Sequence, residues 1–303
     1  MKRRKGFQAF IVLAAAACLL LTAGCSPNLL VFNTAGPVAE VEKRLIIISI
    51  VLVSIVTIPV ILLLFYIIYR YRDTPDNTAP YRPEWSESRL LEIIWWGIPI
   101  IIVGILGAYT VRDTFVLTKP QAKAGPPLTI QVVSLNWKWL FLYPEQNIAT
   151  VNYCQIPVNR TVEFMLTADS PMNSFWVPQL GGQEYTMPGM AMRLWLTANK
   201  PGDYYGTGAN FTGKGFAHMR FNVAARSDLE FNNWVQQVKR TAPALPDRGY
   251  AELAHPSIAE QASFSSFPPE LFRKTVVRDG GMYMKKDPRK KAQTTETKHN
   301  HAH

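Results

Sequence analysis

Two long apolar stretches constrain the fold of this chain more than any other feature. Residues 45–69 contain no charged side chain, and residues 93–111 form a second uncharged stretch. As a helix, each stretch is long enough to cross the hydrocarbon core of a bilayer, which takes about 20 apolar residues. Trp95 and Trp96 open the second stretch and Tyr109 lies near its end, where interfacial aromatic anchors are found. We therefore predict two transmembrane helices.

The connector between the two stretches, residues 70–92, indicates their orientation. It carries four arginines, Arg70, Arg72, Arg82 and Arg89. Positive residues in a short loop favour the cytoplasmic side, although acidic residues in the same loop dilute the signal. The connector is therefore predicted to be cytoplasmic. The segments on the far sides of the two helices, residues 25–44 and a linker at 112–127, then face the outside.

The N-terminus is typical of a secretory signal. Residues 1–24 hold a basic start followed by an apolar run, and Cys25 comes directly after Ala23 and Gly24. This pattern predicts removal of the signal and lipidation of Cys25. Thr22 stands where a lipidated protein usually has leucine, so cleavage without lipidation and an uncleaved anchor stay open as alternatives. The chain is predicted to lie in a bacterial inner membrane, with its C-terminal domain in the periplasm.

From residue 128 onward, short alternating segments replace the long apolar stretches. Three of them are residues 161–167, 192–196 and 219–223. Each alternates apolar and polar side chains as a half-buried strand does, and turn residues such as proline, glycine and asparagine separate them. Several short strands at this spacing predict an antiparallel sandwich or barrel, which we place at residues 128–225.

The residues after the sandwich are predicted to form a helical arm, 226–284, and a disordered tail, 285–303. Apolar residues along one side of residues 228–239 indicate a helix, and residues 256–262 indicate a second, weaker one. The tail is polar and charged and offers almost nothing to a core.

The distribution of charge and cysteine excludes several classes of function. The formal net charge is +10, but the basic clusters lie near the two termini and form no stripe interleaved with aromatic residues. Nucleic-acid binding is therefore not expected. Of the three cysteines, Cys18, Cys25 and Cys154, only Cys154 falls in the predicted sandwich. A disulfide framework is excluded, and one thiolate cannot form a centre that needs two.

Four strings of residues stand out, one at the start of the second predicted transmembrane helix and three in the predicted sandwich. They are LEIIWWGIPIII at 91–102, NWKWLF at 136–141, NSFWVP at 173–178 and PGDYYGTGANFTGKGFAHM at 201–219. In this order, after a signal and a helical hairpin, they make the chain resemble subunit II of the haem–copper respiratory oxidases. The resemblance implies a membrane α-helical hairpin of two transmembrane helices, a periplasmic all-β sandwich of the cupredoxin-like type, and a C-terminal helical extension.

In the cytochrome c oxidase members of that family, the last two strings hold a dinuclear copper centre. Its six ligand positions fall in this chain on Asn173, Gly208, Asn210, Thr212, Phe216 and Met219. Only Met219 keeps the residue type of the ligand. Together with the single cysteine of the domain, this makes the chain similar to the quinol oxidases, which have no copper at this site. No metal is expected in this chain.

For the quinol oxidase branch, the resemblance implies a non-catalytic subunit of a proton-pumping ubiquinol oxidase. The complex would oxidise ubiquinol and reduce oxygen to water, and the haems, the copper and most of the ubiquinol site would belong to subunit I. This chain would carry no cofactor and would contact subunit I, other subunits and membrane lipids. Three alternatives are a cytochrome c oxidase subunit, which the ligand count opposes, a membrane-tethered periplasmic lipoprotein that handles copper through its tail histidines, and a scaffold outside any oxidase. The tail histidines are His299, His301 and His303.

Five individual residues have competing interpretations. The resemblance places Glu92 near the entrance of a proton-conducting route into subunit I, whereas an ordinary membrane-boundary carboxylate would have no such role. Trp137 and Trp139 lie where relatives pass electrons to copper, but without copper we expect them to pack on the sandwich. Met219 is expected to fill the core, and His218 to be an exposed or hydrogen-bonded strand residue.

Overall fold

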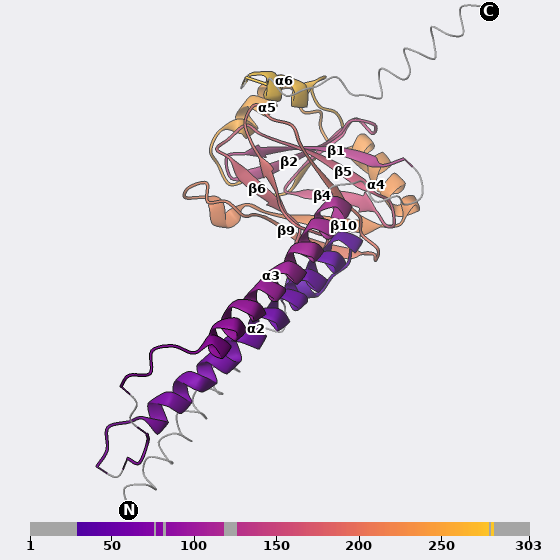
Figure 1. Cartoon of the computed structure of the whole chain (residues 1–303). Helices are drawn as coiled ribbons and strands as arrows, with labels where there is room; N and C mark the ends of the chain where they lie inside the picture. Colours follow the sequence, from indigo (N-terminus) through magenta and orange to yellow (C-terminus); the bar gives the residue numbers. More distant parts are fainter. Residues whose placement is uncertain (1–28, 76, 81–82, 118–125, 279, 282–303) are drawn as a thin grey trace, which may run out of the picture.

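The computed structural model describes residues 29–75, 77–80, 83–117, 126–278 and 280–281. The predicted signal, the predicted lipidation site Cys25 and the tail histidines lie outside these residues. Within them, a pair of long helices projects from a β sandwich, and short helices from the C-terminal part of the chain cover the sandwich (Figure 1).

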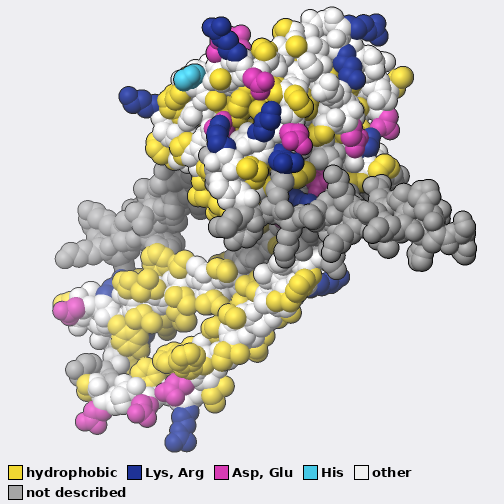
Figure 2. Space-filling view, turned by 90° about the horizontal axis from the view of Figure 1, so that it is seen from above, with side chains coloured by type: hydrophobic (Ala, Val, Ile, Leu, Met, Phe, Trp, Pro, Cys, Tyr) yellow, Lys and Arg dark blue, Asp and Glu magenta, His cyan; other side chains and the backbone are white. Residues whose placement is uncertain are grey.

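The two long helices contain the predicted transmembrane stretches. A short 3-10 helix, η1 (Leu30–Phe32), precedes α2 (Pro37–Arg70), and α3 spans Arg89–Leu117. The two helices lie side by side and lead away from the sandwich (Figure 1). Apolar side chains cover much of their surface, as Figure 2 shows. Both are long and apolar enough to cross a membrane.

Among the described residues, eleven strands form two sheets. The first sheet has the order β11 (Ala262–Phe264), β3 (Ile148–Val151), β2 (Lys138–Tyr143), β1 (Leu128–Leu135), β5 (Val162–Ala168) and β8 (Met192–Leu196). The second has the order β4 (Tyr153–Pro157), β10 (Arg220–Arg226), β9 (Gly202–Gly208), β6 (Asn173–Trp176) and β7 (Glu184–Thr186). Side chains from both sheets share one buried core, so the predicted sandwich is confirmed.

Two strand pairs show that the prediction of purely antiparallel sheets is wrong. β1 pairs in parallel with β5, and β4 pairs in parallel with β10. The other strand pairs are antiparallel. Parallel neighbours need a crossover connection, and here the chain leaves the first sheet for β4 before it returns as β5. Alternation along a single strand carries no information about which neighbour it meets.

Five aromatic rings couple the two sheets. Phe175 and Phe221 of the second sheet stack with ring centroids 4.8 Å apart, and Trp139 of the first meets both rings at 5.5 Å. From the first sheet, Phe141 approaches both of these rings and Phe164 approaches Phe175. All five side chains are buried. Edge-on and stacked pairs of this kind each add about 0.5–1.5 kcal/mol beyond the burial itself.

The C-terminal arm covers the sandwich with three helices. The first, α4 (Asp228–Thr241), begins at a capping box formed by Ser227 and Glu230. Next come α5 (Asp247–Ala254) and α6 (Leu271–Arg278), which pack Tyr250 and Phe272 against the apolar outer face of the first sheet. The predicted helical extension is therefore present.

One helix of the arm was predicted in the wrong place. Residues 256–261 of the predicted helix at 256–262 are irregular, and Ala262 begins β11. Ala262 pairs with Val151 of β3. Because an edge strand is formed by pairing with a distant part of the chain, the local pattern gave no sign of it.

A buried lysine also fastens the arm. Lys138 is fully buried, and its Nζ donates to the carbonyl oxygens of Leu253 at 2.8 Å and His255 at 2.9 Å, and to Ser257 Oγ at 2.7 Å. Burial lowers the pKa of the Lys138 ammonium. As an ammonium, Lys138 donates one N–H to each of these three acceptors. They lie at and after the end of α5, where the helix dipole favours a cation.

Candidate functional site

The positions that match copper ligands come from two strands and the loop between β9 and β10. Asn173 begins β6, and Gly208 ends β9. These strands are antiparallel neighbours, with Phe175 opposite Gly208. The loop then runs through residues 209–219, and Gly208 N donates to Met219 O at 2.9 Å where it returns. The fold therefore brings the separate sequence strings together.

A hydrogen-bonded cluster of neutral groups occupies this place. The side chain of Asn173 is fully buried, and its Nδ2 donates to Met219 Sδ at 3.0 Å. Its Oδ1 accepts from the backbone N–H groups of Ser174 at 2.8 Å and Asn210 at 3.3 Å. Thr212 Oγ1 adds a second contact to the sulfur at 3.4 Å. The amide and the thioether thus satisfy one another.

Gly208 leaves the space that the amide fills. A Cβ atom at this position would lie 2.9 Å from both Nδ2 and Oδ1 of Asn173. That separation is shorter than carbon can tolerate in a packed interior. A cysteine side chain at Gly208 and the Asn173 amide therefore exclude one another in this arrangement.

Phe216 does not join the cluster. It begins the 3-10 helix η2 (Phe216–His218), and its ring packs edge-on against Phe211 with centroids 5.7 Å apart. Phe211 is 80% exposed, so this pair forms an aromatic projection on the loop. His218 lies in η2 and is exposed, so its predicted location in a strand is wrong.

Trp137 braces the loop from the turn between β1 and β2. Its φ is 68°, an uncommon value for a bulky residue. The indole Nε1 donates to Thr212 O at 2.9 Å, and a Cβ atom on Gly215 would lie 2.3 Å from the ring. Strained conformations persist where their surroundings determine them. Here the contacts with the loop hold the indole in place.

Trp139 supports the same loop from inside the core. It is fully buried, and its Nε1 lies 3.4 Å from Met219 O. Met219 is itself fully buried in the core between the sheets. Both tryptophans and Met219 therefore pack as predicted. What sequence reasoning missed is the hydrogen bond from Asn173 to the thioether, since the two residues are 46 positions apart.

The described residues contain no group of three or more His, Cys, Asp or Glu side chains that could hold a metal ion. Cys154 lies in β4, fully buried, and burial raises the pKa of its thiol. A neutral, buried thiol is a poor nucleophile and a poor ligand. The donor set at the loop is an amide, a hydroxyl and a thioether, which does not match a copper centre.

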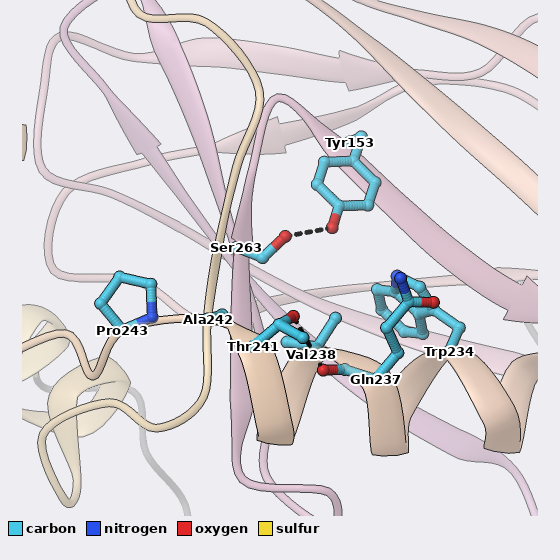
Figure 3. A pocket seen from close by; sticks show the side chains of 8 residues that line it. All are labelled: Tyr153, Trp234, Gln237, Val238, Thr241, Ala242, Pro243 and Ser263. Atoms are coloured by element: carbon cyan, nitrogen blue, oxygen red, sulfur yellow. Dashed lines mark hydrogen bonds between the residues drawn. The ribbon is translucent and has the colours of Figure 1, made fainter.

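A hollow of about 360 Å³ lies between α4, β4 and β11 (Figure 3). Tyr153 OH and Ser263 Oγ hydrogen-bond across it at 2.5 Å, and Trp234 forms part of its wall. Apart from Tyr153 its lining has no titratable side chain, so it offers no acid–base pair for catalysis.

Glu92 lies in the first turn of α3 and is exposed in this chain. Its backbone N–H donates to Ser88 O at 3.0 Å. A carboxylate in the first turn is favoured by the helix dipole. Glu92 therefore lies at the end of α3 that joins the connector, which is the position predicted from the sequence.

Replacing Asn173 should cost the sandwich about 1–3 kcal/mol, because Asn173→Leu leaves the buried N–H group of Ser174 and the half-buried N–H group of Asn210 without this acceptor. The comparison variant is Met219→Leu, which keeps the volume and removes only the thioether, a weak acceptor, so it should cost less than about 1.5 kcal/mol. Denaturant unfolding of the full chain in detergent measures both. Equal costs for the two variants would show that the amide does not hold the cluster together.

The chain matches family models of known proteins. The model for the periplasmic domain of cytochrome c oxidase subunit II matches residues 144–226, and the model for its transmembrane domain matches residues 26–112. Among solved structures, the periplasmic domain of cytochrome oxidase subunit II from Bradyrhizobium japonicum is 24% identical. The aligned region covers 41% of this chain and 97% of the solved domain, with a TM-score of 0.37.

Curated relatives match most of the chain. Quinol oxidase subunit 2 of Bacillus cereus is 43% identical over 88% of this chain and 92% of the relative. Ubiquinol oxidase subunit 2 of Acetobacter aceti is 42% identical over 92% of this chain and 91% of the relative. Cytochrome bo(3) ubiquinol oxidase subunit 2 of Pseudomonas aeruginosa is 43% identical over 90% of this chain and 82% of the relative. The chain therefore belongs to the cytochrome c oxidase subunit II family.

Proposed function

We propose that the chain is subunit II of a bacterial ubiquinol oxidase and that it carries no redox centre. The observation that supports this most directly is the cluster of Asn173, Gly208 and Met219. The amide of Asn173 occupies the space that a cysteine ligand at position 208 would need. The relatives named as quinol and ubiquinol oxidase subunits agree with this function.

In this proposal the complex takes electrons from ubiquinol in the membrane, reduces oxygen to water and translocates protons. Subunit I holds the haems, the copper and most of the ubiquinol site. The chain described here supports assembly and stability, because its apolar helices need partners within the bilayer and its sandwich covers the complex on the periplasmic side. The inner membrane is its location, and a lipid on Cys25 adds a second anchor.

Copper analysis of the purified full chain tests the absence of a redox centre. The proposal expects no stoichiometric copper and no visible absorption. Two coppers per chain that survive replacement of the three tail histidines by alanine would overturn it. Copper lost with those histidines would instead favour the alternative function, a periplasmic copper-handling lipoprotein.

Glu92 is proposed to lie at the entrance of a proton-conducting route. Glu92→Gln should then slow oxygen consumption by the complex in membranes, and more strongly as the pH rises, because fewer protons are available for uptake. The control is Glu87→Gln, which changes an exposed carboxylate on the same connector. A rate equal to that of the unaltered complex at every pH would refute the role of Glu92.

A further inference from the structure

The start of α2 is built into the sandwich. Ala35 N donates to Gln179 O at 2.8 Å, and Asn199 N donates to Ala35 O at 2.7 Å. One helical turn later, Ala39 N donates to Leu180 O at 3.2 Å. Ala35 also belongs to the core between the sheets. The chain therefore leaves the sandwich through backbone hydrogen bonds on both sides. We call residues 35–42, 179–182 and 197–199 the joint.

Gly36 is the tightest contact in the joint. A Cβ atom there would lie 2.4 Å from Thr197 O and 2.9 Å from Leu180 O, both backbone atoms. The backbone of Gly36 is extended, with φ −137° and ψ 156°, which any residue can adopt. The glycine is therefore needed for close approach and not for its conformation. A side chain here would push α2 off the sandwich.

Charged side chains extend the joint along the helices. Glu42 accepts a hydrogen bond from the backbone of Gly182 and lies over that glycine, where a Cβ would come within 2.6 Å of Oε1. Arg44 forms an ion pair with Asp113 of α3 at 3.1 Å, and the Asp113 side chain is 3% exposed. α3 is thus tied to the helix that enters the sandwich.

We propose that the joint makes α2 and the sandwich one rigid body, so that the sandwich keeps a fixed angle and height above the membrane. Relative motion is the default for domains joined by small or polar contacts, but here the connection is a continuous helix whose first turn is hydrogen-bonded into the domain. Leu45, the first residue of the apolar stretch, lies nine residues after Gly36. At 1.5 Å per helical residue, Gly36 stands about 13.5 Å above the start of that stretch. Partner subunits are not needed to orient the sandwich.

Distance measurements between spin labels test this proposal on the full chain in lipid nanodiscs. One nitroxide is attached at Tyr71, beyond the end of α2, and one at Leu229, on the exposed side of α4, through a ketone-bearing amino acid introduced at each position. The labels avoid cysteine chemistry, so Cys25 is left unchanged. Pulsed electron paramagnetic resonance should give a single narrow distance distribution.

Gly36→Ala should broaden that distance distribution and abolish its single peak, because the added carbon meets backbone oxygens that cannot rotate away. Gly107→Ala in α3 is the control, since a Cβ atom there would meet open space, and it should keep the peak. A broad distribution for the unaltered chain, or a narrow one for Gly36→Ala, would overturn the proposal.

Hydrogen exchange of the unaltered chain decides the matter if Gly36→Ala does not fold. The amides of Ala35, Ala39 and Asn199 should exchange as slowly as those in the central strands, because opening the joint requires opening the sandwich. Exchange at the rate of an exposed loop would show that the helix swivels.

Discussion

Trp139→Ala should destabilise the sandwich by about 3–5 kcal/mol, the usual cost of truncating a buried tryptophan to alanine. Folded domains are stable by only about 5–15 kcal/mol in total, so much of the chain should fail to fold or to assemble at growth temperature. The side chain is fully buried and contacts the rings of Phe175 and Phe221 in the opposite sheet. Thermal unfolding of the full chain measures the loss of stability. The amount of the chain that co-purifies with the complex measures the loss of assembly.

Trp139→Phe is the control for this change. It keeps an aromatic ring in the core and loses the indole contact with Met219 O, so its cost should be well below that of the alanine variant. Equal stability of Trp139→Ala and the unaltered chain would mean that the five-ring cluster does not couple the sheets.

Lys138→Met should release the C-terminal arm from the first sheet. Methionine fills a similar volume but donates no hydrogen bond, so the carbonyls of Leu253 and His255 and the hydroxyl of Ser257 lose their shared donor. An acceptor left without a partner costs about 1–3 kcal/mol, partly offset here because no ammonium has to be desolvated. The net loss should be about 2–3 kcal/mol, concentrated in α5 and the residues that follow it.

Hydrogen exchange over residues 247–264 measures that release, with Lys239→Met as the matched control. Lys239 lies in the last turn of α4 and is exposed, so its replacement should leave the exchange unchanged. Unchanged protection of the arm in Lys138→Met would show that apolar contacts alone hold it.

The membrane helices could be predicted because the bilayer imposes a length and a composition on any helix that crosses it. Their outer ends could not. The first stretch was predicted to begin at residue 45, whereas α2 begins at Pro37. The extra turns carry Glu40, Glu42 and Lys43, which hydropathy excludes from a membrane. They are helical because they dock on loops that lie more than 130 positions away in the chain.

The sandwich was predictable strand by strand, but its pairing was not. β8 covers residues 192–196 as predicted, and β5 and β10 lie within a few residues of their predicted bounds. Alternation reports which face of a strand is buried and is silent on its neighbours. The parallel pairs and the edge strand β11 therefore appeared only in the structure.

At the site, the sequence indicated which ligands are missing and could not indicate what replaces them. Asn173, Gly208 and Met219 were identified as vacant positions. Their mutual fit depends on an amide that reaches a sulfur across two strands and a glycine that makes room for it. Lys138 was missed for a similar reason, because a lysine in a strand is usually exposed and its acceptors come from the distant arm.

In the proposed function, electrons reach the complex from a quinol in the membrane and not through this subunit. The most direct measurement is oxygen consumption by the complex isolated through this chain, with ubiquinol and reduced cytochrome c compared as donors at equal reducing power. The proposed function predicts rapid consumption with ubiquinol, none above background with cytochrome c, and haem reduction by ubiquinol alone. Turnover with cytochrome c at a rate comparable to that with ubiquinol would contradict it.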